Sequence, residues 1–66
     1  MQVTVNSKIQ HMAPGSTVAD LLEQLQLAGK RIAVEMNGEI VPKSQHASTP
    51  LLAGAELEIV VAVGGG

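Results

Sequence analysis

The sequence predicts an α+β fold in which a mixed sheet of about five strands packs against one main helix. Three observations support this prediction: short segments alternate apolar and polar residues, one segment carries leucines at helical spacing, and the last segment is apolar on both sides. A chain of 66 residues forms a single domain. We expect residues 1–63 to make up that domain and residues 64–66, all glycine, to form a flexible tail.

Two antiparallel strands are expected at the start of the chain. In residues 1–6 the apolar and polar side chains alternate, which is the period of a half-buried strand. Asn6 and Ser7 favour a turn, and residues 8–12 are long enough to pair back as the second strand. The sequence therefore predicts a β-hairpin.

A helix with one apolar face is expected next. Thr17 stands three residues before Asp20, an acidic variant of the capping box that marks a helix start. The apolar residues that follow recur at positions i, i+3, i+4 and i+7: Val18, Leu21, Leu22 and Leu25. We expect Gly29 to end the helix in a left-handed conformation, with Lys30 and Arg31 placed favourably at the negative end of the helix dipole.

A second hairpin is expected after the helix. Residues 32–36 alternate again, and the Asn37–Gly38 pair that follows favours a tight type I′ turn into a short strand at residues 39–41. The polar residues 43–50 are expected to form a surface loop.

The last strand, predicted at residues 56–63, is expected at the centre of the sheet. Its final residues are apolar on both faces, which suits a strand with neighbours on both sides, and the first strand is one candidate neighbour. Leu51 and Leu52 before it are expected to cover an open end of the core. The order of two strands, a helix and further strands, with the last strand central, is that of a ubiquitin-like, or β-grasp, roll.

The composition excludes several classes of function. The chain has no Cys, which excludes thiolate metal sites, disulfide scaffolds and cysteine nucleophiles. It has no aromatic residue and a net charge of −2, so we expect no nucleic-acid partner. The longest apolar run is far too short to cross a membrane, and residues 1–6 lack the features of a secretory signal, so we expect a cytoplasmic protein.

No internal catalytic or metal site is expected. His11 and His46 have no third ligand at a recognisable spacing and are expected to be ordinary edge or surface residues. The Asp20–Leu21–Leu22 run lacks the serine that would hold the prosthetic arm of an acyl carrier. Met12 and Met36 are expected to fill the core.

The glycine triplet is the feature that carries chemistry. Gly66 offers only its α-carboxylate, which is a poor electrophile unless it is first activated, for example as an acyl-adenylate. Gly64 and Gly65 have no side chains, so they can thread through a narrow channel into the active site of a partner. The alternative is that these glycines are incidental, as chain ends often are, or a vector-derived scar.

The whole chain resembles the ThiS family of sulfur carrier proteins. The resemblance rests on residues 1–6, on the TVADLLEQL helix at residues 17–25, on residues 33–45, and on the LEIVVAVGGG ending at residues 57–66. The middle segment and the terminal glycines are the more specific parts. The family requires two terminal glycines, so the third, Gly64, is an extra one.

The resemblance implies a function in thiamine biosynthesis and a set of partners. A ThiF-like E1 adenylyltransferase would activate Gly66 with ATP, and sulfur from a cysteine desulfurase relay would convert it to a thiocarboxylate. A ThiG-like thiazole synthase would then take the sulfur. The chain itself would be a carrier with no catalytic site and no bound cofactor.

Three alternatives remain open from the sequence. The small subunit of molybdopterin synthase shares the architecture and the Gly-Gly chemistry, although it usually has a longer chain. The chain could instead be a noncovalent β-grasp binding module with an incidental tail, or a protein tag that is joined to lysines. These functions differ in what they require of the Gly66 carboxylate.

Strand alternation also predicts where partners dock. Val60 and Ala62, with Ala33 if its strand is a neighbour, are expected to face away from the helix and to form a small apolar patch beside the tail. We expect the activating enzyme and the synthase to bind there, although such apolarity can also be incidental.

Overall fold

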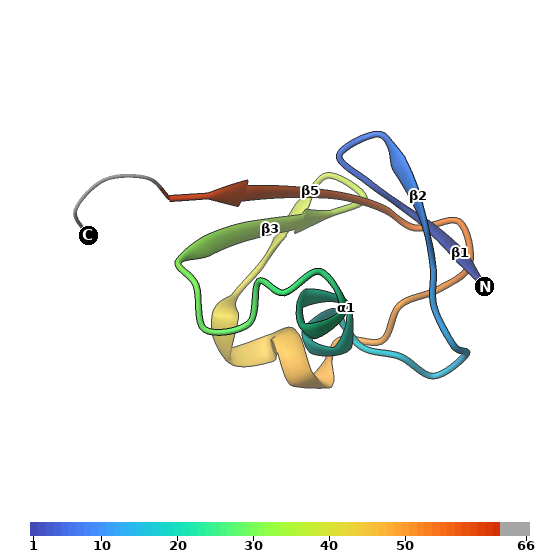
Figure 1. Cartoon of the computed structure of the whole chain (residues 1–66), viewed down its shortest axis with the longest axis horizontal. Helices are drawn as coiled ribbons and strands as arrows, with labels where there is room; N and C mark the ends of the chain where they lie inside the picture. Colours follow the sequence, from blue (N-terminus) through green and yellow to red (C-terminus); the bar gives the residue numbers. More distant parts are fainter. Residues whose placement is uncertain (63–66) are drawn as a thin grey trace.

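A five-stranded sheet packs against one main helix, as the sequence predicts, in the computed structural model, which describes residues 1–62 (Figure 1). The strands lie in the order β2-β1-β5-β3-β4. The elements are β1 (Gln2–Val5), β2 (Lys8–His11), α1 (Val18–Gln24), β3 (Ile32–Met36), β4 (Glu39–Val41), the 3₁₀ helix η1 (Lys43–Ser48) and β5 (Glu56–Val61). The predicted α+β class, with a mixed sheet, is confirmed.

Strand β5 occupies the centre of the sheet, as predicted. It runs parallel to β1, with Thr4 opposite Glu56 and Val5 opposite Leu57. On its other side it runs antiparallel to β3, with partners from Met36↔Leu57 to Ile32↔Val61. The strand ends at Val61, so the prediction that it includes Ala62 is wrong; Val63, the last residue of the predicted strand, lies outside the described residues.

Both predicted hairpins are present. Strands β1 and β2 are joined by Asn6 and Ser7, with φ of 49° and 69°, and strands β3 and β4 by Asn37 and Gly38, with φ of 52° and 87°. Positive φ at both central residues is the requirement of a type I′ turn, and asparagine and glycine tolerate it best. The turn residues therefore fix the register of both edges of the sheet.

Helix α1 begins as predicted and ends earlier. The Thr17 backbone N–H donates to Asp20 Oδ2 at 2.9 Å, and the Asp20 N–H donates to Thr17 Oγ1 at 3.3 Å, which completes the capping box. At the other end Gln26 takes the left-handed conformation, with φ of 62°, and the Leu27 N–H donates to Leu22 O at 2.7 Å. This is a Schellman arrangement. The prediction that Gly29 ends the helix is therefore wrong.

The predicted dipole contact is wrong for the same reason. Lys30 and Arg31 lie beyond the Schellman turn, and the last turn of α1 contains no basic residue. The chain makes a further turn before β3, in which the Lys30 N–H donates to Leu27 O at 3.1 Å. The two cations thus belong to the segment that leads into β3 and not to the helix.

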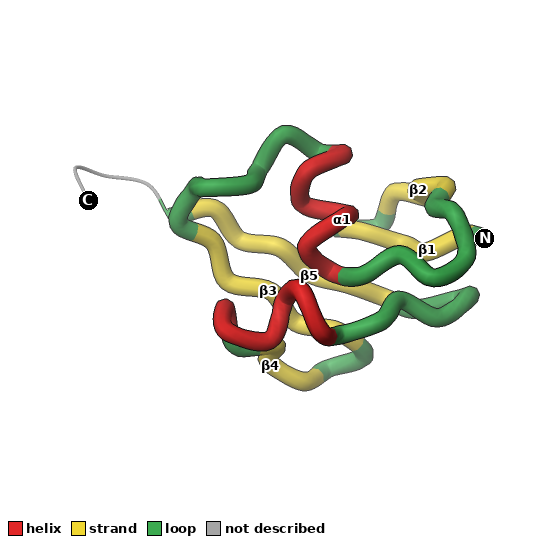
Figure 2. Tube along the Cα trace, turned by 90° about the horizontal axis from the view of Figure 1, so that it is seen from below, coloured by secondary structure: helices red, strands yellow, loops and turns green. Residues whose placement is uncertain are grey.

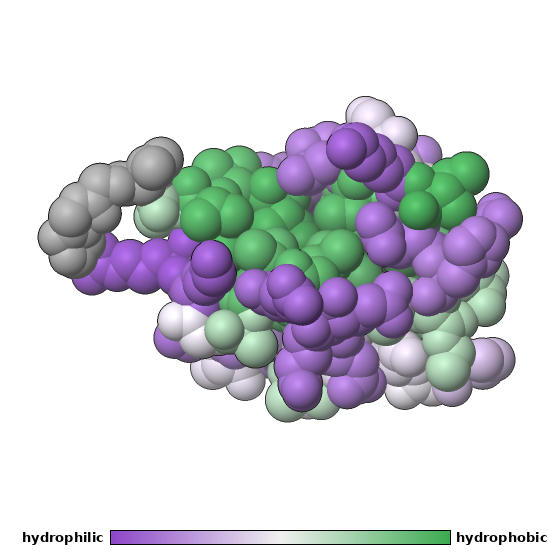
Figure 3. All heavy atoms as spheres, in the orientation of Figure 1, coloured by the Kyte–Doolittle hydropathy of each residue, from purple (hydrophilic) through white to green (hydrophobic). Residues whose placement is uncertain are grey.

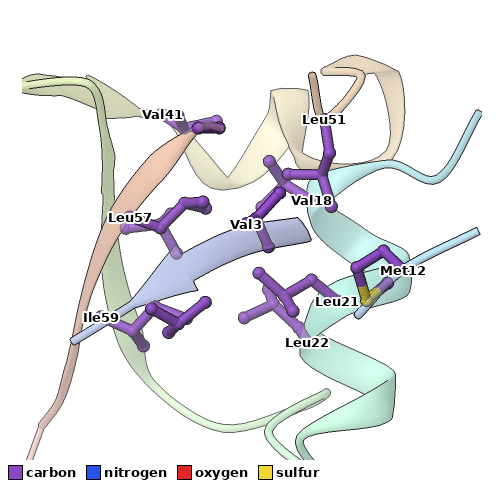
Figure 4. Packing of buried hydrophobic residues seen from close by; sticks show 12 residues of the cluster. Val3, Met12, Val18, Leu21, Leu22, Val41, Leu51, Leu57 and Ile59 are labelled. Atoms are coloured by element: carbon purple, nitrogen blue, oxygen red, sulfur yellow. The ribbon is translucent and has the colours of Figure 1, made fainter. Parts of the chain in front are cut away.

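The core lies between the sheet and the two helices, which cover one of its faces (Figure 2). Leu21 and Leu22 point from α1 toward the side chains of Val3, Leu57 and Ile59 on the central strands (Figure 4). Met12 is buried and Met36 packs partly buried against the cluster, as predicted. Leu57 and Ile59, which are alternate residues of β5, therefore hold this strand in place through their burial in the core.

The segment around residues 43–52 differs from its prediction in two ways. The predicted polar loop is the 3₁₀ helix η1, and its His46 is buried, with Nε2 donating to Val41 O at 3.0 Å. The prediction of a surface histidine is wrong, because η1 folds back beneath the edge of the sheet. Leu51 covers the core as predicted, but Leu52 is 68% exposed.

Candidate functional site

The candidate site begins where β5 leaves the sheet. The pairing of β5 with β1 ends at Leu57, whereas its pairing with β3 continues to Val61. The next residue is still held, because the Ala62 N–H donates to Arg31 O at 2.9 Å. The predicted reactive residue Gly66 and the predicted threading residues Gly64 and Gly65 follow, outside the described residues.

The three residues of the predicted docking patch lie at this end of the sheet. Ala33 and Val60 are direct cross-strand partners, and Ala62 follows two residues after Val60, just beyond the end of β5. All three are exposed, Val60 to 63%. The structure therefore brings together the residues that strand alternation alone had grouped.

A groove of about 320 Å³ adjoins this apolar patch. Strand β4 pairs only with residues 34–36, so the first residues of β3 form an open edge of the sheet. The groove lies along this edge and is lined by the patch, by apolar residues from α1 and the segment after it, and by His46 of η1. Figure 3 shows apolar side chains gathered in the middle of the face in view and reaching the end of the described chain.

Three of the four cationic side chains of the protein line the same groove: Lys30, Arg31 and Lys43. The sequence placed two of them at a helix end and gave the third no role. Lys30 and Arg31 lie beside the patch because they lead directly into β3, and Lys43 lies there because η1 folds back toward it.

The other half of β5 has the opposite character. Glu58 lies directly opposite Glu35 on β3, and both line a small hollow together with Glu56. No lysine or arginine is among the described residues that line this hollow. Like charges placed opposite each other on a sheet are destabilising, and a sheet tolerates them where both side chains reach water.

The described residues offer no metal site and no membrane-spanning helix. Within residues 1–62 no three His, Asp or Glu side chains are grouped so that they could hold a metal ion. His11 lies exposed on β2, whereas His46 is buried in η1. The two histidines therefore lie on different elements and in different environments. No helix among the same residues is long and apolar enough to span a bilayer.

Comparison with known proteins places the chain in a family. The model of the ThiS family matches residues 2–66. The chain is 33% identical to the sulfur carrier protein ThiS of Escherichia coli, over 100% of both chains. It is 39% identical to a thiazole synthase of Paramagnetospirillum magneticum, but it spans only 20% of the length of that protein.

Two solved structures of a thiamine biosynthesis protein (ThiS) from Geobacter metallireducens share the fold. The crystal structure superposes with a TM-score of 0.83 at 32% sequence identity and covers 100% of both chains. The solution structure gives a TM-score of 0.80 at 32% identity, over 100% of this chain and 88% of the other. The β-grasp architecture expected from the sequence is confirmed, and the chain belongs to the ThiS family.

Proposed function

We propose that this chain is a sulfur carrier of thiamine biosynthesis and that it carries the sulfur as a thiocarboxylate on Gly66. The observation that carries the proposal is the full-length match to a sulfur carrier protein, in which both chains are covered completely. At the level of the family, the predicted function is confirmed. The molybdopterin synthase alternative is not favoured, because the relatives named above belong to the thiamine pathway.

Within this chain, bonds form and break only at the carboxylate of Gly66. One carboxylate oxygen of Gly66 attacks the α-phosphate of ATP, pyrophosphate leaves, and an acyl-adenylate forms. A sulfide equivalent then attacks the acyl carbon and displaces AMP, which leaves the thiocarboxylate. The partner supplies every catalytic group, so the proposal gives this chain no catalytic site and no bound cofactor, and ATP is the substrate of the activating enzyme.

The proposed partners follow from the same chemistry. The thiazole synthase relative contains a segment similar to this entire chain, which supports a ThiG-like synthase as the acceptor of the sulfur. A ThiF-like E1 adenylyltransferase and a cysteine desulfurase relay are the proposed activator and sulfur source. A cytoplasmic location is part of the same proposal.

The apolar patch of Ala33, Val60 and Ala62 is the proposed docking surface for these partners. It lies at the end of β5 from which the chain continues toward Gly66, so a partner bound there contacts the chain only a few residues before the proposed reactive carboxylate. The cations that line the adjoining groove would add an electrostatic contribution to docking.

Pyrophosphate exchange tests the proposal at its first step. The 66-residue chain, an E1-like adenylating enzyme from the same organism, ATP and labelled pyrophosphate should give labelled ATP. A chain that lacks both Gly65 and Gly66, and one that carries an added alanine after Gly66, should give none, while both retain the melting temperature of the parent. Exchange that persists in both variants would overturn the assignment of Gly66.

A further inference from the structure

Two asparagines form hydrogen bonds with the backbone of β5, one from each side of the strand. Asn37, in the β3–β4 turn, donates its N–H to Glu56 O at 2.7 Å and accepts from the Glu56 N–H through Oδ1 at 3.0 Å. Asn6, in the β1–β2 turn, accepts from the Ile59 N–H through Oδ1 at 2.7 Å and donates through Nδ2 to Ile59 O at 2.9 Å. One asparagine therefore holds the start of β5 and the other its middle.

The Asn6 carboxamide takes the place of a missing residue of β1. The last backbone bond between these strands runs from the Asn6 N–H to Leu57 O at 2.9 Å, because the chain then turns away into β2. The next groups of β5 on this side are the N–H and C=O of Ile59. A carboxamide has one donor and one acceptor in a planar arrangement, like a peptide group, so it can satisfy both.

This contact lies close to the apolar patch. Ile59 directly precedes Val60, and beyond it the described part of β5 is paired only with β3. Without the Asn6 carboxamide, β5 would, from Glu58 onward, have hydrogen-bond partners only on the β3 side. The side of β5 facing β1 would then lack its last hydrogen bonds before the patch.

We infer that Asn6 is a positioning residue for carboxylate activation, because its carboxamide extends the β1–β5 ladder and holds β5 at the base of the docking patch. This inference rests on the proposed function. The role proposed for Asn6 is indirect: it acts through Ile59 on the geometry that a partner meets. The sequence alone predicts Asn6 only as a turn residue.

Replacing each asparagine by glycine gives a matched test. Asn6 and Asn37 have similar positive φ, 49° and 52°, so glycine fits both positions without backbone strain. Each variant removes a carboxamide that is hydrogen-bonded to β5, and each raises the conformational entropy of the unfolded chain by a similar amount. Asn6→Asp is a third variant: it keeps the acceptor for the Ile59 N–H and loses the donor to Ile59 O.

Hydrogen exchange and adenylation kinetics are the two measurements. In Asn6→Gly the amide of Ile59 should exchange about three- to tenfold faster, as expected for one lost hydrogen bond, whereas in Asn37→Gly the faster amide should be that of Glu56. With the E1-like enzyme, KM for the carrier should rise about fivefold in Asn6→Gly at unchanged kcat, because docking must first order β5. Asn37→Gly should keep the parent KM at equal folded fraction, and Asn6→Asp should lie between.

The outcomes separate the two levels of the proposal. If the parent chain supports no adenylation, the proposed function fails, and the exchange measurement still decides whether Asn6 holds Ile59. If the parent chain is adenylated but KM is unchanged in Asn6→Gly, or rises equally in Asn37→Gly, the positioning role is refuted. If Asn6→Gly does not fold, Asn6→Asp tests the role through KM alone: a smaller rise than the one predicted for Asn6→Gly is expected, and an unchanged KM would refute the positioning role.

Discussion

The two halves of strand β5 are built differently. Residues 56–59 have hydrogen-bond partners on both sides, from β3 and from β1 with its extension by Asn6, and their outward side chains are Glu56 and Glu58. The second half consists of Val60 and Val61, with Ala62 just beyond the strand; among the described residues these three are bonded only on the side of β3, and Val60 and Ala62 are exposed. The first half is anchored and charged, and the second half is apolar and less constrained.

This difference shows how a small chain without a catalytic site separates two tasks. The inner residues of the first half, Leu57 and Ile59, are buried beneath α1 and hold the fold together. The second half contributes little to the core and leaves its apolar side chains open for a partner. Changes in the first half should therefore act on stability, and changes in the second half on transfer of sulfur.

The largest expected effect is on stability, from Leu57→Ala. Leu57 is 2% exposed, and removing such a side chain costs about 2–5 kcal/mol of unfolding free energy. A domain of this size has only about 3–10 kcal/mol in total, so urea denaturation should show a large fall in the midpoint. Val61→Ala is the control: Val61 is 43% exposed, and the loss should stay below about 1 kcal/mol. Equal losses would show that the two halves are not distinct.

The next effect is on docking, from Val60→Asp. A carboxylate at the centre of the apolar patch should lower kcat/KM for adenylation about tenfold, which corresponds to about 1.4 kcal/mol. Ile40→Asp is the matched control, because Ile40 is 65% exposed, faces outward on β4, and lies opposite Glu35 and away from the patch. The kinetics are compared at equal folded fraction. If both variants lose the same activity, or neither loses any, the patch is not the docking surface.

The smallest effect is a gain in stability, from Glu58→Gln. Removing one charge of the Glu35–Glu58 pair should raise the unfolding free energy by about 0.2–1 kcal/mol. The gain should shrink in high salt, because added ions screen the repulsion in the parent chain. Thermal melts at low and high ionic strength measure it, and adenylation kinetics should stay unchanged. A loss of stability would mean that the pair is favourable.

Features set by local chemistry were predicted well. The Thr17–Asp20 capping box and the Asn37–Gly38 turn depend on residues that are neighbours in sequence, and both are present in the structure. The central position of β5 was also predicted, because apolar residues on both faces of a strand require neighbours on both sides. The same alternation predicted that the residues of the docking patch lie together and exposed; their role in docking stays a prediction.

Features set by long-range packing were missed. Glutamine is not a preferred left-handed residue, so nothing marked Gln26 as the end of α1 ahead of Gly29. The polar segment around His46 gave no sign that its histidine would be buried beneath the sheet. The Asn6 carboxamide reaches a residue 53 positions away, and only the finished sheet reveals that contact.

Intact-mass spectrometry tests the central claim most directly. The parent chain is incubated with ATP, sulfide and an E1-like adenylating enzyme from the same organism, and its mass is compared with that of the untreated chain. We predict a species that is heavier by one exchange of oxygen for sulfur, located on Gly66 by fragmentation and absent when ATP is omitted. A chain of unchanged mass, in a reaction where the same enzyme converts an established sulfur carrier protein ThiS, would contradict the assignment.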